Sequence, residues 1–195
     1  MSAFVHNSAG TAMAVMKAAQ LNNQANQLEA SGDLAGAEKL FLESLRLKIK
    51  GTGEDSIQTA LSKNALGELY MKMEGKWEDA KKLLEDADRV RSRIDDFDAA
   101  CTRDNLGQLW EIKGDMVKAK AARERNPGSM ICSNFNCSLS GANVKSKRDD
   151  LKNCARCKST WYCSAQCQKV DWKTRHKKWC KKPETESAEQ VSTTG

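Results

Sequence analysis

The chain has 195 residues and a formal net charge of +6, and seven of its eight cysteines lie within Cys132–Cys180. No stretch approaches the roughly 18 consecutive apolar residues of a membrane-spanning helix, and Met1–Gln20 lacks the basic start and apolar run of a signal peptide. The sequence therefore predicts an intracellular protein, of the cytoplasm or nucleus, with no membrane segment. In that reducing environment, clustered cysteines indicate metal binding rather than disulfides.

Composition divides the chain into two parts. Up to residue 126 it is rich in Ala, Leu, Lys and Glu and has no proline, whereas cysteine and lysine dominate beyond Pro127. The second part has about 50 residues, a size at which metals usually stand in for a hydrophobic core. We expect these regions: a flexible N-terminus (1–10), helical repeats (11–126), a linker (127–131), a metal-binding module (132–180) and a disordered polar tail (181–195).

Residues 11–126 follow a pattern of helix, turn and helix three times over. The turn glycines Gly32, Gly75 and Gly114 are 43 and 39 residues apart, which indicates a repeat of about 40 residues. Small residues flank each turn at matching positions: Ala25, Gly67 and Gly107 before it, Ala37, Ala80 and Ala119 after it. Small side chains let antiparallel helices approach closely, and larger residues fill the space beside them: Leu28, Tyr70 and Trp110.

This pattern resembles tetratricopeptide repeats of the longer-period variety. The resemblance implies a mainly α fold with an N-terminal array of about three helix pairs, which presents a concave face to partner proteins. An ordinary helical bundle is the alternative. Asp55 or Ser56 is expected to cap one helix, Cys101 is expected to be a buried inert thiol, and His6 has no companion ligand.

The cysteine-rich part offers four pairs of soft ligands with the spacings that tetrahedral zinc uses. The pairs are Cys132 and Cys137, Cys154 and Cys157, Cys163 and Cys167, and His176 and Cys180. Three intervening residues, as in the last two pairs, place both ligands on one face of a helical turn. Eight ligands make two complete sites, and spacing alone leaves open whether the pairs combine sequentially or interleave.

The run Tyr162-Cys163, Cys167-Gln168, Asp171-Trp172, His176 and Cys180 resembles the MYND zinc finger. That family has seven cysteines and one histidine in this order, whereas RING and PHD fingers place their histidine in the middle. The resemblance implies two structural Zn²⁺ ions per chain with interleaved ligands: Cys132, Cys137, Cys163 and Cys167 for zinc 1, and Cys154, Cys157, His176 and Cys180 for zinc 2. Cys132 and Cys137 have four residues between them where the family usually has two.

Both sites would be closed, with no open position for a reacting water, so the sequence predicts no enzymatic activity. MYND fingers also occur within SET-domain methyltransferases, but the rest of this chain follows the repeat pattern. The resemblance instead implies an adaptor whose finger binds short proline-containing peptides through Ala155, Gln168 and Trp172, while the repeats bind another protein segment. Ala155 lacks the hydroxyl that some family members have there.

The basic run 169–182 supports an alternative function. Seven of its 14 residues are Lys or Arg, which is typical of a solvated helical face and also compatible with phosphate contact. The alternative is a nucleic-acid-associated regulatory protein that uses the basic face of the finger. Specific base readout is not expected, because no recognition helix is free.

Overall fold

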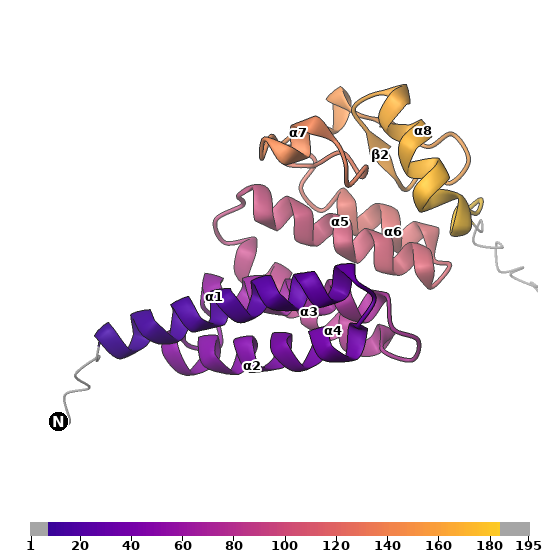
Figure 1. The fold of residues 1–195 in the computed structure, drawn as a ribbon. Coiled ribbons are helices and arrows are strands. Elements are labelled where there is room, and N and C mark those ends of the chain that lie inside the picture. Colours follow the sequence, from indigo (N-terminus) through magenta and orange to yellow (C-terminus); the bar gives the residue numbers. More distant parts are fainter. Residues whose placement is uncertain (1–7, 184–195) are drawn as a thin grey trace, which may run out of the picture.

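The computed structural model describes residues 8–183 and is mainly α, as predicted (Figure 1). Six helices come first: α1 (Ser8–Ala30), α2 (Leu34–Thr52), α3 (Ile57–Met71), α4 (Trp77–Arg91), α5 (Phe97–Ile112) and α6 (Met116–Arg123). Smaller elements follow: α7 (Ser138–Gly141), η1 (Arg148–Asp150), β1 (Lys152–Asn153), β2 (Trp161–Tyr162), α8 (Ala165–Thr174) and η2 (His176–Lys178).

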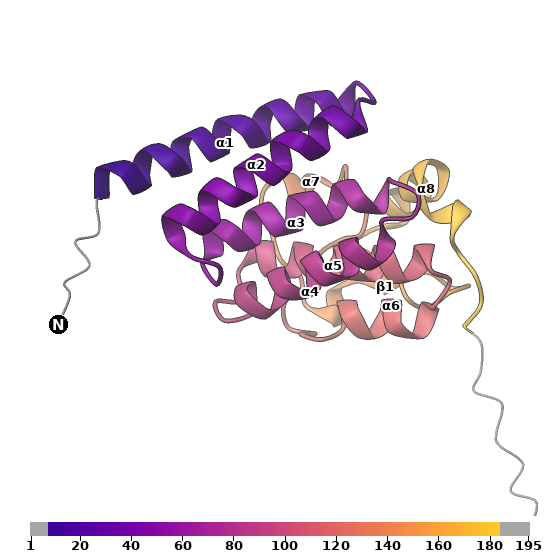
Figure 2. The same ribbon diagram turned by 90° about the horizontal axis from the view of Figure 1, so that it is seen from below.

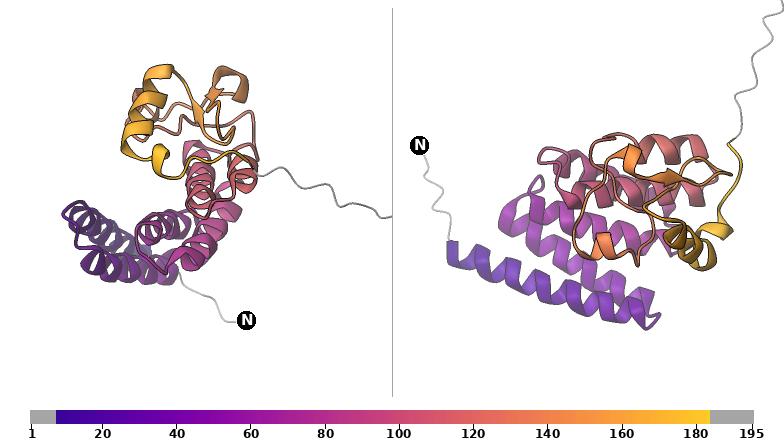
Figure 3. Two further views of the ribbon diagram at one scale, coloured as in Figure 1. Left: turned by 90° about the vertical axis from the view of Figure 1, so that its right-hand side faces the viewer. Right: turned by 90° about the horizontal axis from the view of Figure 1, so that it is seen from above.

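The first six helices form three antiparallel pairs that stack one upon another, which confirms the predicted helical array (Figure 2). Each helix packs chiefly on its neighbours in sequence, and α3 also contacts α1 and α5 directly. The stack curves, so that the first pair and the cysteine-rich part lie at its two ends (Figure 3). Because α3 contacts both α1 and α5, these three helices line one face of the array.

The three turns within the pairs are built as the sequence predicts. Gly32, Gly75 and Gly114 have φ of 90°, 80° and 83°, a left-handed conformation that glycine adopts without steric cost. Asp33 and Asp115, one residue later, cap the following helices by accepting hydrogen bonds from backbone amides. Between the pairs, Ser56 rather than Asp55 caps α3, accepting from the amide of Thr59.

Small residues lie where the paired helices meet. Ala25, Ala37, Ala80 and Ala119 are fully buried. A Cβ atom on Gly67 would lie 2.8 Å from Cγ of Leu84 on α4, and one on Gly107 would lie 2.6 Å from Cζ of Arg123 on α6. These distances are too short for real side chains, so the close approach of each pair requires glycine there.

The chain outside these helices differs in part from the expected boundaries. Helix α1 already includes residues 8–10, so the helix begins three residues before the boundary expected at residue 11. Residues 1–7, with His6, and residues 184–195, most of the predicted polar tail, lie outside the described residues. Within the described part, no helix has the length and apolar character needed to cross a membrane.

The cysteine-rich part lies against α5 and α6, the last helix pair (Figure 1). Its small antiparallel sheet pairs Lys152 with Tyr162 and Asn153 with Trp161. The segment 127–131, expected as a linker, is held on both sides: the guanidinium of Arg103 on α5 donates to the carbonyl of Ser129 at 2.8 Å, and Met130 forms a β-bridge with Ser146.

Candidate metal centre

The first cluster is formed by Cys132, Cys137, Cys163 and Cys167. Cys132 and Cys137 come from the loop before α7, Cys163 directly follows β2, and Cys167 lies in the first turn of α8. Ser164 caps α8 by accepting from the amide of Cys167, which fixes the turn that carries both later ligands. The amide of Ser133 donates to the carbonyl of Trp161 at 2.8 Å, which holds the first pair beside β2.

The second cluster is formed by Cys154, Cys157, His176 and Cys180. Cys154 and Cys157 lie on the turn between β1 and β2, and the amide of Cys154 donates to the carbonyl of Thr160 at 2.9 Å. His176 begins the short helix η2, and Cys180 follows it, its amide donating to the carbonyl of His176 at 2.9 Å. All four residues are buried.

The separations within each cluster match tetrahedral zinc. The possible ligand atoms of each cluster lie within 4.8 Å of one another. Sγ–Sγ distances are 3.6 Å for Cys137–Cys163 and 3.8 Å for Cys154–Cys180, and Nε2 of His176 lies 3.5 Å from Sγ of Cys157. Zn–S bonds of about 2.3 Å give a tetrahedral S–S edge of about 3.8 Å, and a shorter Zn–N bond gives about 3.5 Å. The clusters therefore fit two structural zinc ions, with the interleaved ligands that the resemblance implies.

The longer spacing between Cys132 and Cys137 does not disrupt the first cluster. The extra residues form a turn in which the amide of Cys137 donates to the carbonyl of Asn134 at 2.9 Å. Phe135 at its tip is 89% exposed. The insertion therefore points outward, and both cysteines remain buried beside Cys163 and Cys167.

One cysteine in each cluster is already biased toward the thiolate form that binds metal. In the second cluster, a hydrogen bond with Cys154, together with those from His176 and Ser159, lowers the pKa of Cys157 to about 2. In the first, burial would raise the pKa of Cys167, but hydrogen bonds from Asn134 and Ser164 outweigh it and lower the pKa to about 7. Cys101 is different: it is half-buried rather than buried as expected, and its partial burial raises its pKa to about 12, which disfavours a reactive thiolate.

The three residues expected at the peptide groove lie beside the second cluster or on α8. Ala155 follows Cys154 on the turn and is exposed. Gln168 and Trp172 are one helical turn apart on α8, and both are half-buried. The ring of Trp172 packs edge-on against His176, with 5.8 Å between centroids. Trp172 thus has a packing role, and its remaining surface is open to solvent.

A buried ionic network joins this centre to the helical array, and sequence reasoning missed it. Glu111 on α5 is fully buried, and its Oε1 accepts a hydrogen bond from Oγ1 of Thr160 at 2.8 Å. Its Oε2 lies 2.8 Å from Nη1 of Arg175 and 3.2 Å from Nδ1 of the zinc ligand His176. Burial alone would raise the pKa of Glu111, but Arg123, His176 and Arg175 hold it well below its usual range.

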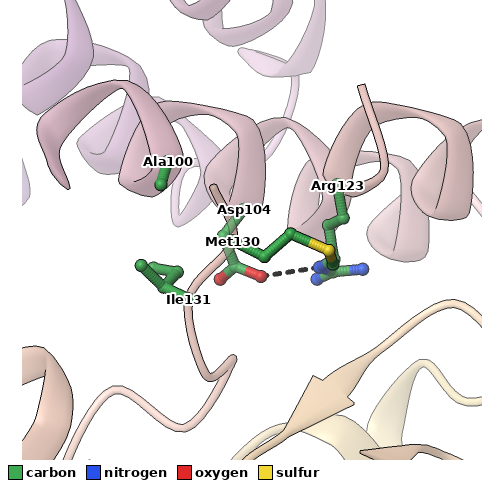
Figure 4. Close-up of a pocket in the computed structure, with 5 residues that line it drawn as sticks. All are labelled: Ala100, Asp104, Arg123, Met130 and Ile131. Atoms are coloured by element: carbon green, nitrogen blue, oxygen red, sulfur yellow. Dashed lines mark hydrogen bonds and ion pairs between the residues drawn. The ribbon is translucent and has the colours of Figure 1, made fainter. Parts of the chain in front are cut away.

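Arg123 on α6 is the second centre of this network. Its Nε donates to Oδ1 of Asp104 at 2.6 Å, as drawn in Figure 4, and its Nη1 donates to the carbonyl of Ser159 at 2.8 Å. Its Nη2 lies 2.6 Å from Oε1 of Glu111, an ion pair whose angle falls short of a hydrogen bond. The hydroxyl of Ser133 also donates to Oδ1 of Asp104 at 2.6 Å. Two carboxylates of the array are thus neutralised where the finger docks.

Arg175 is part of the predicted basic run but does not contribute to a solvated face. It donates from Nη2 to Oδ2 of Asp171 at 2.7 Å and reaches Glu111 with Nη1. The hydroxyl of Tyr162 also donates to Asp171, at 2.7 Å. The one sequence signal for this network was the spacing of Asp104 and Glu111, seven residues apart and therefore on one face of a helix.

Comparison with known proteins identifies both parts. The profile of the MYND finger family matches residues 132–180, and that of tetratricopeptide repeats matches residues 17–93. Two curated relatives come from Arabidopsis thaliana. "Ubiquitin carboxyl-terminal hydrolase 19" is 41% identical over 59 residues, 30% of this chain, and "Histone-lysine N-methyltransferase ASHR1" is 35% identical over 68 residues, 31% of this chain.

The chain spans only 8% and 14% of the length of these two relatives, so what is shared is a small part of each enzyme. The tetratricopeptide match runs from within α1 to the end of α4, and the third pair, α5 and α6, continues the same geometry beyond it. Both modules are typically non-catalytic and mediate protein interactions. The chain thus contains a tetratricopeptide-repeat region at residues 17–93 and a MYND finger at residues 132–180, whose two ligand clusters fit two zinc ions.

Proposed function

We propose that the protein is a zinc-dependent adaptor: its MYND finger binds short proline-containing peptides, and its helical repeats bind a second protein segment. The observation that carries this proposal is the closed chemistry of the finger. Each zinc has four protein ligands available, which leaves no position for a catalytic water. The metal ions therefore serve to fold a binding surface.

That surface would lie on α8 and the turn before β2. Gln168 offers an amide that both donates and accepts hydrogen bonds, and the partly open ring of Trp172 offers an apolar wall for a proline ring. The edge of the two-stranded sheet lies nearby in the chain, and an extended peptide can add to such an edge. Ala155 contributes a small side chain that leaves room for the peptide backbone.

The repeats would use the face lined by α1, α3 and α5. That face has a polar ladder: the Asn105 amide donates to Oδ1 of Asn64 at 3.2 Å and to Oε1 of Glu68 at 2.6 Å. The donors of this ladder are used within it, but Asn105 is partly exposed, and its side-chain carbonyl can accept a hydrogen bond from the backbone of an extended segment without regard to its sequence. The ladder therefore suits a partner segment that binds in an extended form.

A peptide-array screen with the zinc-loaded full chain tests the finger, followed by calorimetric titration of the best peptide. We expect proline-containing peptides among the hits and a loss of about tenfold in affinity for Gln168→Ala. Ala155→Ser restores a hydroxyl and should strengthen binding. Lys173→Ala, an exposed change on the same helix, is the matched control. The proposal fails if no proline-containing peptide binds, or if Gln168→Ala and Lys173→Ala have the same effect.

The same titrations, repeated at several salt concentrations, distinguish peptide binding from the nucleic-acid alternative. Binding to phosphates weakens steeply with salt, whereas binding of an uncharged peptide weakens little. With Arg175 turned inward, the basic run presents lysines only: Lys169, Lys173, Lys177, Lys178, Lys181 and Lys182. Salt-sensitive binding of single-stranded oligonucleotides, tighter than that of any peptide, would favour the alternative.

A further inference from the structure

Glu111 of the helical array lies in direct contact with a zinc ligand of the finger. His176 directs Nε2 toward Cys157 and the second cluster, and its other ring nitrogen, Nδ1, lies 3.2 Å from Oε2 of Glu111. With Nε2 bound to zinc, the imidazole proton sits on Nδ1 and is donated to the carboxylate. Histidines that bind metals are commonly oriented by a carboxylate in this way.

The finger has no carboxylate of its own for this task among its described residues. Its acidic side chains are Asp149, Asp150 and Asp171. Asp149 and Asp150 are exposed in η1, and Asp171 is occupied by Tyr162 and Arg175. The carboxylate acceptor for His176 therefore comes from the helical array, 65 residues earlier in the chain, and at 3.2 Å it lies closer to Nδ1 than the Thr160 hydroxyl of the finger does, at 3.4 Å.

We propose that Glu111 is the outer carboxylate of the second zinc site. It positions His176 and thereby sets how tightly the finger holds that zinc. By reciprocity, zinc bound at this site stabilises the packing of α5 and α6 on the finger. This inference concerns the metal site alone and does not depend on peptide binding.

The surroundings of Glu111 fit a positioning role. Its two oxygens are contacted by four groups: Thr160 and Arg123 on Oε1, Arg175 and His176 on Oε2. A carboxylate held from four sides cannot rotate away from the imidazole. The two arginines also neutralise its charge, so the carboxylate stays ionised and remains a strong acceptor although it is fully buried.

The first zinc site provides an internal control. Its cysteines are hydrogen-bonded to one another and to Ser164 and Asn134, all residues of the finger. Among the described residues of the finger, Asp104 of the array is hydrogen-bonded to Ser133 alone, beside the ligand Cys132. Loss of Glu111 should therefore affect the second zinc and leave the first unchanged.

The test measures zinc release from the full chain to a chromophoric chelator, with Glu111→Gln as the variant. Glutamine has the same shape but one acceptor oxygen for four donors. We expect one of the two released zincs to leave about 10–100-fold faster and the other at the unaltered rate. Asp104→Asn is the matched control, because it removes a buried carboxylate that pairs with the same Arg123 but touches no zinc ligand.

A spectroscopic readout separates positioning from general stability. In the zinc-loaded chain, the Nδ1 proton of His176 should give a resolved downfield NMR signal that Glu111→Gln shifts and Asp104→Asn leaves in place. If Glu111→Gln does not fold, Glu111→Asp replaces it. That change keeps the negative charge beside Arg123 and Arg175 but draws the carboxylate back from Nδ1 of His176, so it should speed release of the same zinc by severalfold.

Three outcomes would overturn the proposal. Both zincs could leave faster to the same extent in Glu111→Gln, the Asp104→Asn control could match it, or neither rate could change. The reciprocal arm uses hydrogen exchange with and without chelator. We expect α5 and α6 to lose protection when zinc is removed while α1 and α2 keep theirs, and equal protection of α5 and α6 in both states would contradict the coupling.

Discussion

The second and third helix pairs both place a glycine of the first helix against a side chain of the second helix, but that side chain is apolar in one pair and charged in the other. In the second pair, Gly67 faces Leu84, nine residues after the turn glycine Gly75. In the third, Gly107 faces Arg123, nine residues after Gly114. The same position is held by Phe41 in the first pair.

This difference shows how the last pair of a helical-repeat array can pack against a different kind of domain in place of a further helix pair. Leu84 is fully buried in the apolar core, so the second pair can stack on a further helix pair. Arg123 is also buried, but it neutralises Asp104 and Glu111, and its Nη1 donates to the carbonyl of Ser159 in the finger. Replacing one apolar side chain by a guanidinium thus converts a stacking surface into a polar docking surface.

Removal of zinc should give the largest difference in stability between the finger, residues 132–180, and the helical array. Residues 132–180 have small, metal-dependent clusters in place of a large core, and structural zinc contributes about 10 kcal/mol or more to the folding of such modules. After excess chelator, we expect residues 132–180 to lose their hydrogen-exchange protection, and the near-ultraviolet circular dichroism to lose the contribution of the finger's three tryptophans, Trp161, Trp172 and Trp179. Helices α1 to α4 should keep their helical signal, and equal loss in both regions would contradict this.

Arg123→Leu makes the third pair resemble the second and should be strongly destabilising. It leaves Asp104 and Glu111 buried without their shared cation, which typically costs about 3–5 kcal/mol. Urea unfolding followed by circular dichroism measures the change. Arg123→Lys keeps the charge but not the three contacts, so its free energy of unfolding should lie between those of Arg123→Leu and the native chain. An unchanged free energy of unfolding in Arg123→Leu would show that the ionic network does not hold the finger against the array.

Alanine substitutions at Gly67 and Gly107 should show whether the second and third helix pairs differ in their tolerance of an added methyl group. Gly107→Ala and Gly67→Ala each introduce a Cβ into a contact below 3 Å, which costs about 1–3 kcal/mol. We expect the cost at Gly107 to be the larger, because Leu84 can change rotamer whereas Arg123 is held by Asp104, Glu111 and Ser159. Gly141→Ala, with nothing within 4 Å of its Cβ, is the control for thermal melts. Equal costs would mean that Arg123 moves as freely as Leu84.

The smallest expected effect concerns Glu68 on α3. Burial raises the pKa of Glu68, and hydrogen bonds from Asn105 and Asn64 oppose this shift. A raised pKa in the folded state means that the ionised carboxylate opposes folding above its ordinary pKa of 4.5, and not below it. Glu68→Gln should therefore raise Tm at pH 7 and leave Tm unchanged below about pH 4. A lower Tm at pH 7 would contradict this.

Much of the fold could be predicted because its determinants are local. The turn glycines, the caps at Asp33 and Asp115 and the small residues at the pair interfaces all act within one repeat. The two ligand sets depended on the order of the pairs, which the resemblance to the MYND finger supplied and spacing did not. Ligand separations then agree with tetrahedral zinc at both sites.

The docking network could not be predicted, because its members are far apart in the chain. Glu111 and His176 are 65 residues apart, and Asp104 and Ser133 are 29 apart. In the sequence, Arg123 continues the hydrophilic face of a short helix and Arg175 belongs to a basic run. Only the packing of the finger on α5 and α6 removes both guanidinium groups from water and gives them carboxylate partners.

The tethered segment 127–131 has a consequence for ligands with two binding motifs. Arg103 holds Ser129, Met130 bridges to Ser146, and the amide of Arg148 donates to the carbonyl of Pro127 at 2.7 Å. The finger therefore cannot swing on a flexible tether, and the distance between its surface and that of the repeats is fixed. For a partner that engages both surfaces, the effective concentration of the second motif is set by the partner's own spacer length.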